Sequence, residues 1–470
     1  MECILIRWFK AGWFRAAGQL KMRAKRWDLA LKSFRKAAEY EPGNLLTQIQ
    51  IAWCLHQLKD YRAAIQHFEI ALQKRPDYGA AHAYLALALA ESQRTEEAVD
   101  EVRRALRISA KMKRRAFFET KLGEWLNELG RSEEAIQPLQ CAIASQPHSA
   151  SAHYQLGYAY ARLNRHHDAE KEFRGSIRFE PTLAPTYYSL GLSLVELKRF
   201  DDAIVAYKEA IRLRPDADTH FSLGVAYNEL GRRADEISEY KQAIAIEAND
   251  FFSWNNLAIA YSQSGDHESS IQTWKSAIEL NPDNVGAYTS LALEYEHVGR
   301  YDDALKAAEQ VERIRPDSAI SYGNVASFLC RLGQFDAALQ KARYAIQLDP
   351  DYADAHCIAA YAMNGLHNVE GAIPEYLKAI ELKPDYLEAL VNLGATYFES
   401  GRSLDAITPL IRAIELKPDC LEAHDYLGAT FLKNGDRERA MEQLQIIKNL
   451  KPDFEGELAK LLRNKNPVNQ

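Results

Sequence analysis

Cysteine is scarce in the 470-residue chain, and its six copies are scattered without a CxxC pair. Neither a disulfide framework nor a zinc knuckle is therefore indicated, and we expect a reducing, cytoplasmic location. Long apolar runs are also missing, because no stretch approaches the roughly 18 residues that a membrane-spanning helix requires. The short apolar run at the N-terminus is broken by Arg7, so it is typical of neither a signal peptide nor a membrane span.

An excess of positive charge and the common catalytic motifs are lacking as well. The chain has 58 Lys and Arg residues against 65 Asp and Glu residues, a formal net charge of −7. A general nucleic-acid binder needs clustered cations to neutralise phosphates, so nucleic acid is not the expected partner. No glycine-rich phosphate loop, nucleophile elbow or HExxH motif occurs. The sequence thus predicts no enzyme activity, no cofactor and no metal site.

The chain does contain a repeat of 34 residues. The segment ELKPDYLEALVNLGATY at 381–397 returns as ELKPDCLEAHDYLGATF at 415–431. The same period extends over thirteen units from Ala11 to Phe454, with three residues inserted before the fourth unit and one residue missing from the sixth. A fixed period of this length indicates a stack of similar supersecondary units rather than one central core.

Three positions define each unit. Position eight is always Gly or Ala, and position twenty is Ala in eleven units, with Glu236 and Ser270 as the exceptions. Small residues at both positions indicate two helices that cross closely, and we expect local repacking around Glu236. Position thirty-two is Pro in eleven units, which ends a helix. Glycines such as Gly130 and Gly231 lie between the two helices, where a left-handed cap is expected.

The pattern large-x2-Leu-Gly-x2-Tyr, followed by Ala, an aromatic residue, Ala and Pro, resembles the tetratricopeptide repeat (TPR) family. It is well represented by YYSLGLSLVELKRFDDAIVAYKEAIRLRPD at 187–216. The resemblance implies an all-α TPR solenoid, a right-handed superhelix of antiparallel helix pairs, whose concave groove is lined mainly by first helices. It also implies a scaffold or adaptor, cytoplasmic and without catalysis, that binds a protein or peptide segment in this groove.

The repeat divides the chain into three expected parts. These are an N-terminal capping segment at 1–10, the TPR array at 11–454, and a C-terminal capping helix and tail at 455–470. The units of the array are 11–44, 45–78, 79–112, 116–149, 150–183, 184–216, 217–250, 251–284, 285–318, 319–352, 353–386, 387–420 and 421–454.

The resemblance places positions two, five, nine and twelve of each unit on the groove. In units two and five to eight these positions are rich in aromatic and aliphatic residues, which predicts a partner-binding surface. An alternative is that tight winding shields these side chains against one another. The predicted groove residues are Ile49, Trp53, Tyr154, Tyr158, Tyr188, Leu192, Phe221, Val225, Phe252, Asn255 and Ile259. Late in the chain the same stripe becomes acidic, with Asp354, Glu388, Glu422 and Asp425.

A second interpretation of function stays open. Long TPR arrays precede the catalytic half of protein O-linked N-acetylglucosamine transferases, so the chain could be an accessory, substrate-recruiting relative that lacks this half. That family carries a ladder of asparagines at position six, which only Asn256, Asn324 and Asn392 match here. No unit has the Lys and Asn pair with which some TPR proteins clamp the carboxylate tail of chaperones.

Two basic regions interrupt the even charge. The first is a basic patch that contains Arg103, Arg104, Arg107, Lys111, Lys113, Arg114 and Arg115. It is a candidate site for an anionic partner. The alternative is structural, because cations near a helix C-terminus interact favourably with the helix dipole. The other is the N-terminal segment, where cations alternate with Trp8, Phe9, Trp13 and Phe14. We expect it to cap the open end of the solenoid, and contact with an anionic membrane is the less favoured alternative.

Histidines recur at position four of five units that are never adjacent. Histidines two units apart lie too far from one another to share a metal whose ligand bonds are about 2 Å long. We therefore interpret them as packing residues that replace the aromatic side chain of other units. They are His82, His153, His220, His356 and His424.

Overall fold

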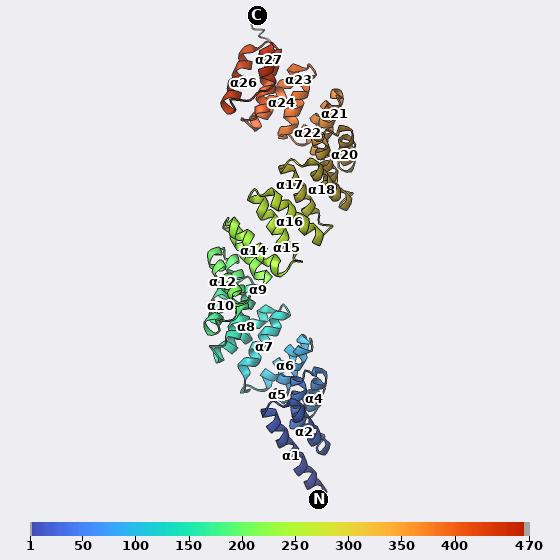
Figure 1. Cartoon of the computed structure of the whole chain (residues 1–470). Coiled ribbons are helices and arrows are strands. Elements are labelled where there is room, and N and C mark those ends of the chain that lie inside the picture. The colour runs from blue at the N-terminus through green and yellow to red at the C-terminus, as the bar shows by residue number, and fades with distance from the viewer. Residues whose placement is uncertain (1, 465–470) are drawn as a thin grey trace. The chain divides into compact units, whose positions relative to one another are not determined.

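The computed structural model describes the backbone of residues 2–464 and the side chains of residues 6–463. Every regular element within residues 2–464 is an α-helix, and the helices follow one another as tandem antiparallel pairs (Figure 1). The chain divides into two compact units, residues 1–247 and 248–470. The predicted all-α TPR solenoid is thereby confirmed.

The first unit contains seven pairs of helices. Their bounds are α1 (Glu2–Arg23), α2 (Trp27–Tyr40), α3 (Leu45–Gln57), α4 (Tyr61–Lys74), α5 (Gly79–Glu91), α6 (Thr95–Ile108), α7 (Arg115–Glu128), α8 (Ser132–Ser145), α9 (Ala150–Arg162), α10 (His166–Phe179), α11 (Ala184–Glu196), α12 (Phe200–Leu213), α13 (Ala217–Glu229) and α14 (Arg233–Ile246).

The second unit contains six pairs and one final helix. Their bounds are α15 (Phe251–Gln263), α16 (His267–Leu280), α17 (Val285–His297), α18 (Tyr301–Ile314), α19 (Ala319–Arg331), α20 (Phe335–Leu348), α21 (Ala353–Gly365), α22 (Val369–Leu382), α23 (Leu387–Glu399), α24 (Ser403–Leu416), α25 (Leu421–Lys433), α26 (Arg437–Leu450) and α27 (Glu457–Asn464).

Position eight admits a large side chain from the second helix of the same pair. A Cβ atom built on Gly191 would lie 2.4 Å from the ring of Tyr207, and one built on Gly157 would lie 2.7 Å from Phe173. The glycine thus leaves room for the aromatic residue at position twenty-four, which is buried in both pairs. Within each of the two compact units, every helix also packs against the helix that follows it. These crossings therefore join into extended apolar cores.

The expected caps at 1–10 and 455–470 stay predictions, and both ends are helical in the described residues. Residues 2–10 continue without a break into α1, where Trp8 and Phe9 are exposed. At the other end α27 packs on α25, and Leu458 is fully buried against Gly428. Residues 465–470 of the predicted tail lie outside the described residues.

None of the helices in residues 2–464 combines the length and the apolar character needed to cross a lipid bilayer.

Candidate functional site

The predicted groove residues of the first unit lie on first helices. Tyr154 and Tyr158 are on α9, Tyr188 and Leu192 on α11, and Phe221 and Val225 on α13. Leu192 is 42% exposed, whereas the other five are half-buried. Since α9 contacts α11 and α11 contacts α13, these residues form a row along neighbouring helices.

Several of these rings also contribute to the core. The ring centroid of Tyr154 lies 6.0 Å from that of Phe173, and Tyr188 lies equally far from Tyr207. Burial raises the pKa of Tyr154, whose hydroxyl is hydrogen-bonded to the side chain of Ser189. Each tyrosine therefore has one part committed to packing and one part at the surface.

A hollow lies at the surface where α9 and α11 meet. It has a volume of about 450 Å³, and Tyr158 and Leu192 line it together with Phe173 and Glu196. Two predicted groove residues thus border the same hollow, whose lining also contains one cation, Arg162, beside Glu196.

The predicted groove residues on α3 lie in a packed environment. Trp53 is half-buried, with its ring 5.3 Å from His56 and 4.8 Å from Tyr84 on α5. Ile49 is also half-buried and packs against the core of the first unit. These two side chains link α3 to its surroundings.

The remaining predicted groove residues belong to the second unit. Phe252 on α15 is 67% exposed, whereas Asn255 and Ile259 are half-buried. Asn256, next to this stripe, donates from Nδ2 to the carbonyl oxygen of Phe252 at 2.9 Å, so its amide is held by its own helix.

Three arginines of the basic patch are already paired with carboxylates. Arg103 contacts Glu134 at 2.6 Å, and Arg104 contacts Glu101 at 3.0 Å. Arg115 contacts Glu119 at 2.8 Å, and its guanidinium also donates to the carbonyl oxygens at the end of α6. The anionic-partner role thus stays a prediction that rests on the exposed residues Arg107, Lys111, Lys113 and Arg114.

The position-four histidines join three segments. In each of them Nδ1 bonds the residue nineteen positions later on the second helix, as His153 does with Glu172 at 2.6 Å. In four of them Nε2 lies within hydrogen-bond distance of a proline carbonyl from the preceding pair, such as Pro147 at 3.1 Å. These contacts assign the histidines a role in joining consecutive pairs.

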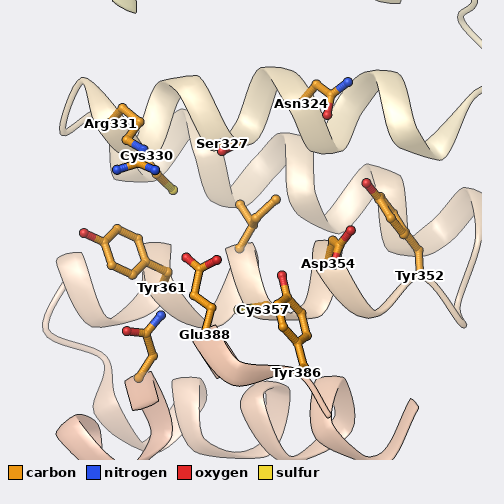
Figure 2. Close-up of a pocket in the computed structure, with 12 residues that line it drawn as sticks. Asn324, Ser327, Cys330, Arg331, Tyr352, Asp354, Cys357, Tyr361, Tyr386 and Glu388 are labelled. Carbon is orange, nitrogen blue, oxygen red and sulfur yellow. The ribbon is translucent and has the colours of Figure 1, made fainter. Parts of the chain in front are cut away.

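The predicted apolar groove residues do not include those of a pocket on α19, α21 and α23. It has a volume of about 320 Å³ and lies between first helices of the second unit (Figure 2). Its lining contains Asn324, Ser327, Cys330, Arg331, Tyr352, Asp354, Cys357, Ile358, Tyr361, Tyr386, Glu388 and Asn392. The sequence does contain a signal for it, because a Tyr-x-acid element recurs one 34-residue repeat apart, as Tyr352-x-Asp354 and Tyr386-x-Glu388.

The last acidic residue of the stripe serves another purpose. Asp425 is 5% exposed, and its carboxylate accepts from the backbone N–H groups of Glu457 and Leu458 at 2.7 and 3.1 Å. Burial raises its pKa, and these two hydrogen bonds oppose that shift. Asp425 therefore caps the N-terminus of α27 and is not part of an open groove.

Solved structures with a similar arrangement include yeast Tom70, which is 17% identical, with 93% of this chain and 99% of that chain covered and a TM-score of 0.36. YrrB, described as a TPR protein with an unusual peptide-binding site, is 22% identical, with 41% and 96% covered and a TM-score of 0.37. The Cut9–Hcn1 hetero-tetramer is 14% identical, with 97% and 96% covered and a TM-score of 0.42. No curated protein sequence matches significantly.

Family models of this repeat match the chain from the N-terminal region to residue 401. A model described as TPR repeat matches residues 123–164, 191–231, 260–299 and 368–401. Three models described as tetratricopeptide repeat match residues 15–78, 51–112, 150–183, 217–250, 239–272 and 285–318. Together these matches cover more than half of the chain. The chain therefore belongs to the tetratricopeptide repeat family.

Proposed function

We propose that the chain is a protein-interaction scaffold without catalytic activity, and that a partner segment binds along α9, α11 and α13. The observation that carries this proposal is the hollow between α9 and α11, which Tyr158 and Leu192 border. Apolar surface of this kind, held on rigid helices and only partly covered, is typical of sites that take an apolar side chain of a partner.

The half-buried tyrosines suit this role. The rings of Tyr154 and Tyr188 are held by contacts with Phe173 and Tyr207, so little side-chain entropy is lost when a partner packs on them. Tyr158 and Tyr188 also carry hydroxyls that can orient a polypeptide by hydrogen bonds. A cytoplasmic location, expected from the cysteine pattern, stays a prediction.

Affinity capture with the full chain tests the proposal. We expect the variant in which Tyr154, Tyr158 and Tyr188 are all replaced by Ala to recover at least tenfold less of the proteins that the wild type retains. Leu192→Asn, at an exposed position, should weaken capture severalfold while leaving the core intact. A matched control replaces Ile70, Val205 and Ile246, which are exposed on second helices of the same unit, by Ala.

Circular dichroism and thermal unfolding of each variant show whether it is folded. If the folded tyrosine variant and the folded Leu192→Asn variant both capture the same proteins as the wild type, the groove on α9, α11 and α13 is not the binding surface.

A further inference from the structure

The pocket on α19, α21 and α23 has an unusual combination of side chains. Tyr352 and Tyr386 are the residues just before α21 and α23, and Asp354 and Glu388 follow in the first turns of these helices. The repeat therefore places two copies of a Tyr-x-acid element one helix pair apart. Figure 2 shows Tyr386 and Glu388 at the start of α23 and Tyr361 and Asp354 on α21, all of which line the pocket.

The two carboxylates have no cationic partner. Within residues 6–463, neither Asp354 nor Glu388 forms an ion pair with Lys or Arg. Arg331 lines the same pocket, and Glu296 lies 3.8 Å from its guanidinium in a partly exposed ion pair. The lining thus holds two carboxylates against one guanidinium, a formal charge of −1.

The two thiols that line the pocket are buried and neutral. Cys330 and Cys357 are 9% and 3% exposed, and burial raises the pKa of each thiol to about 12. The hydroxyl of Tyr376 is buried without a hydrogen-bond partner and interacts electrostatically with both cysteines. These thiols thus add no charge to the pocket. Glu388 is exposed, so water and salt partly screen the attraction between the carboxylates and an entering cation.

The hydroxyls at the rim are held in the same field. The Tyr386 hydroxyl is hydrogen-bonded to Asp354, and burial together with the nearby acidic groups raises its pKa. Burial, aided by Asp354 and Asp349, raises the pKa of Tyr352 to about 12. Both tyrosines therefore stay neutral. The Tyr386 ring already meets a cation, since Nζ of Lys383 lies 4.6 Å from its centroid, whereas the Tyr352 ring borders the pocket and attracts cations by cation–π interaction.

These features select the charge of the ligand. An anion would be repelled by Asp354 and Glu388, and a neutral apolar group would remove water from the carboxylates without pairing them. A guanidinium or ammonium group pairs with the carboxylates and contacts the Tyr352 ring. The volume of about 320 Å³ is at the lower end of the range for ligand sites, so it suits one long side chain.

We propose that this pocket binds one Arg or Lys side chain of an extended partner polypeptide, with Asp354 and Glu388 pairing its charge. The amides of Asn324 and Asn392 also line the pocket and are able to bond the peptide backbone on either side of that residue. The inference rests on the proposed function to the extent that the ligand belongs to a polypeptide. It adds a basic specificity that the apolar surface of α9 and α11 does not have.

The test uses the full chain and a fluorescent eleven-residue Gly/Ser peptide with one central Arg. We expect this peptide and its Lys counterpart to bind at least tenfold more tightly than peptides with Gln or Glu at the centre. The Asp354→Asn and Glu388→Gln double variant keeps the shape of both side chains and should lose at least tenfold in affinity. Glu422→Gln, at the equivalent position of the next 34-residue repeat, is the matched control and should bind like the wild type.

Equal binding of the Arg and Gln peptides, or unchanged affinity of the folded double variant, overturns the proposal. Binding should also weaken severalfold when NaCl rises from 50 to 500 mM, because charge pairing at a partly open site is screened. N-acetylarginine methylamide separates the two sources of a guanidinium. If it binds as tightly as the peptide, the site takes a small cation and the polypeptide part of the proposal is wrong.

Failure here differs from failure of the scaffold proposal. Should capture depend on Tyr154, Tyr158 and Tyr188 while no basic peptide binds, only the specificity of the α19–α23 pocket is refuted. Should basic peptides bind while capture ignores the tyrosines, only the role of α9, α11 and α13 is refuted.

Discussion

Position twenty of every repeat is completely buried, and this makes Glu236 exceptional. Eleven units have Ala there, and Ser270 satisfies its hydroxyl by donating to the carbonyl oxygen of Ala258 at 2.9 Å. Glu236 instead forms an ion pair with Arg233 and is hydrogen-bonded to Asn228. Burial raises the pKa of Glu236, and Arg233 offsets only part of that shift.

A raised pKa means that folding favours the protonated carboxyl. The folded chain then binds more protons than the unfolded chain between the ordinary pKa of 4.5 and the raised value. Across this window the free energy of unfolding falls as the pH rises, so the ionised Glu236 destabilises the fold near neutral pH.

We expect Glu236→Ala to raise the free energy of unfolding by about 1 kcal/mol at pH 7, because a buried ion pair is often less stable than an apolar replacement. The gain should shrink as the pH falls toward 4.5, where the wild-type carboxyl is protonated. Urea unfolding between pH 5 and 8, with hydrogen exchange of α13 and α14 as a local readout, measures this. Arg233→Ala is the opposite control and should destabilise by about 3 kcal/mol, because it leaves the carboxylate unpaired.

A loss of stability at pH 7 in Glu236→Ala would show that the carboxylate contributes more than its burial costs.

The turn between the helices of each pair shows how far sequence reasoning at single residues extends. The glycine pattern predicted left-handed caps at six positions, including Gly231 and Gly265, and both have positive φ. The same position is left-handed in all thirteen pairs, and six of the residues there are not glycine, for example Lys198 with a φ of 58°. Sequence could not show these six, because the packing of the pair forces the conformation at a cost of about 1 kcal/mol.

At the scale of the helix pair, the histidine contacts form a repeated latch. His153 bonds Glu172 on the second helix and the carbonyl oxygen of Pro147 in the preceding pair. The second pair of the chain reverses this arrangement. There Gln48 donates to the carbonyl oxygen of Pro42, and its Oε1 bonds Nδ1 of His67.

This reversal predicts that the two partners can be exchanged. His153→Ala should lower the free energy of unfolding by about 1–2 kcal/mol, because it removes both contacts of the imidazole, with the Glu172 carboxylate and with the Pro147 carbonyl oxygen. The double variant His153→Gln with Glu172→His reproduces the Gln48 and His67 arrangement and should lie within about 0.5 kcal/mol of the wild type. Urea unfolding together with hydrogen exchange of α9 and α10 measures both.

Glu172→Ala completes the double-mutant cycle and should show a coupling energy of about 1 kcal/mol with His153→Ala. If the exchanged pair is as unstable as the single alanine variants, the latch depends on the identity of each side chain and not on its hydrogen bonds.

Sequence predicted the elements of the fold better than the chemistry of the surface. The spacing of Gly191, Ala203 and the prolines gave helix pairs because small residues and helix ends have local causes. The acidic stripe was visible, but its members have different roles, since Asp425 caps α27 whereas Asp354 lines a pocket. That distinction depends on which helix covers each residue, and a repeat pattern carries no information on this.

At the scale of the whole molecule, each large apolar core lies within one of the two compact units. The core of the first unit extends from Ala30 to Tyr227, and the cores of the second lie between Ala258 and Leu458. The second unit also supplies its own helix start, because the Asp250 carboxylate accepts from the backbone N–H of Phe252 and Ser253 at 3.1 and 3.0 Å. Neither unit thus draws its main core from the other.

We expect residues 1–247 and 248–470 to fold when each is expressed alone. In a repeat array stability is the sum of each repeat and its contacts with neighbours, so a fragment that keeps whole pairs keeps most of that sum. Far-UV circular dichroism should show each fragment to be highly helical, and urea should unfold each with a sigmoidal transition.

A fragment of residues 1–230 is the matched control, because it ends after α13 and lacks α14. It removes Tyr240, whose fully buried ring packs 5.6 Å from Phe221 and against Gly224. Without this ring the apolar face of α13 is open to water, and an isolated helix of 13 residues is marginal by itself. Hydrogen exchange should therefore show α13 protected in 1–247 and unprotected in 1–230, whereas equal protection would mean that α14 does not stabilise its pair.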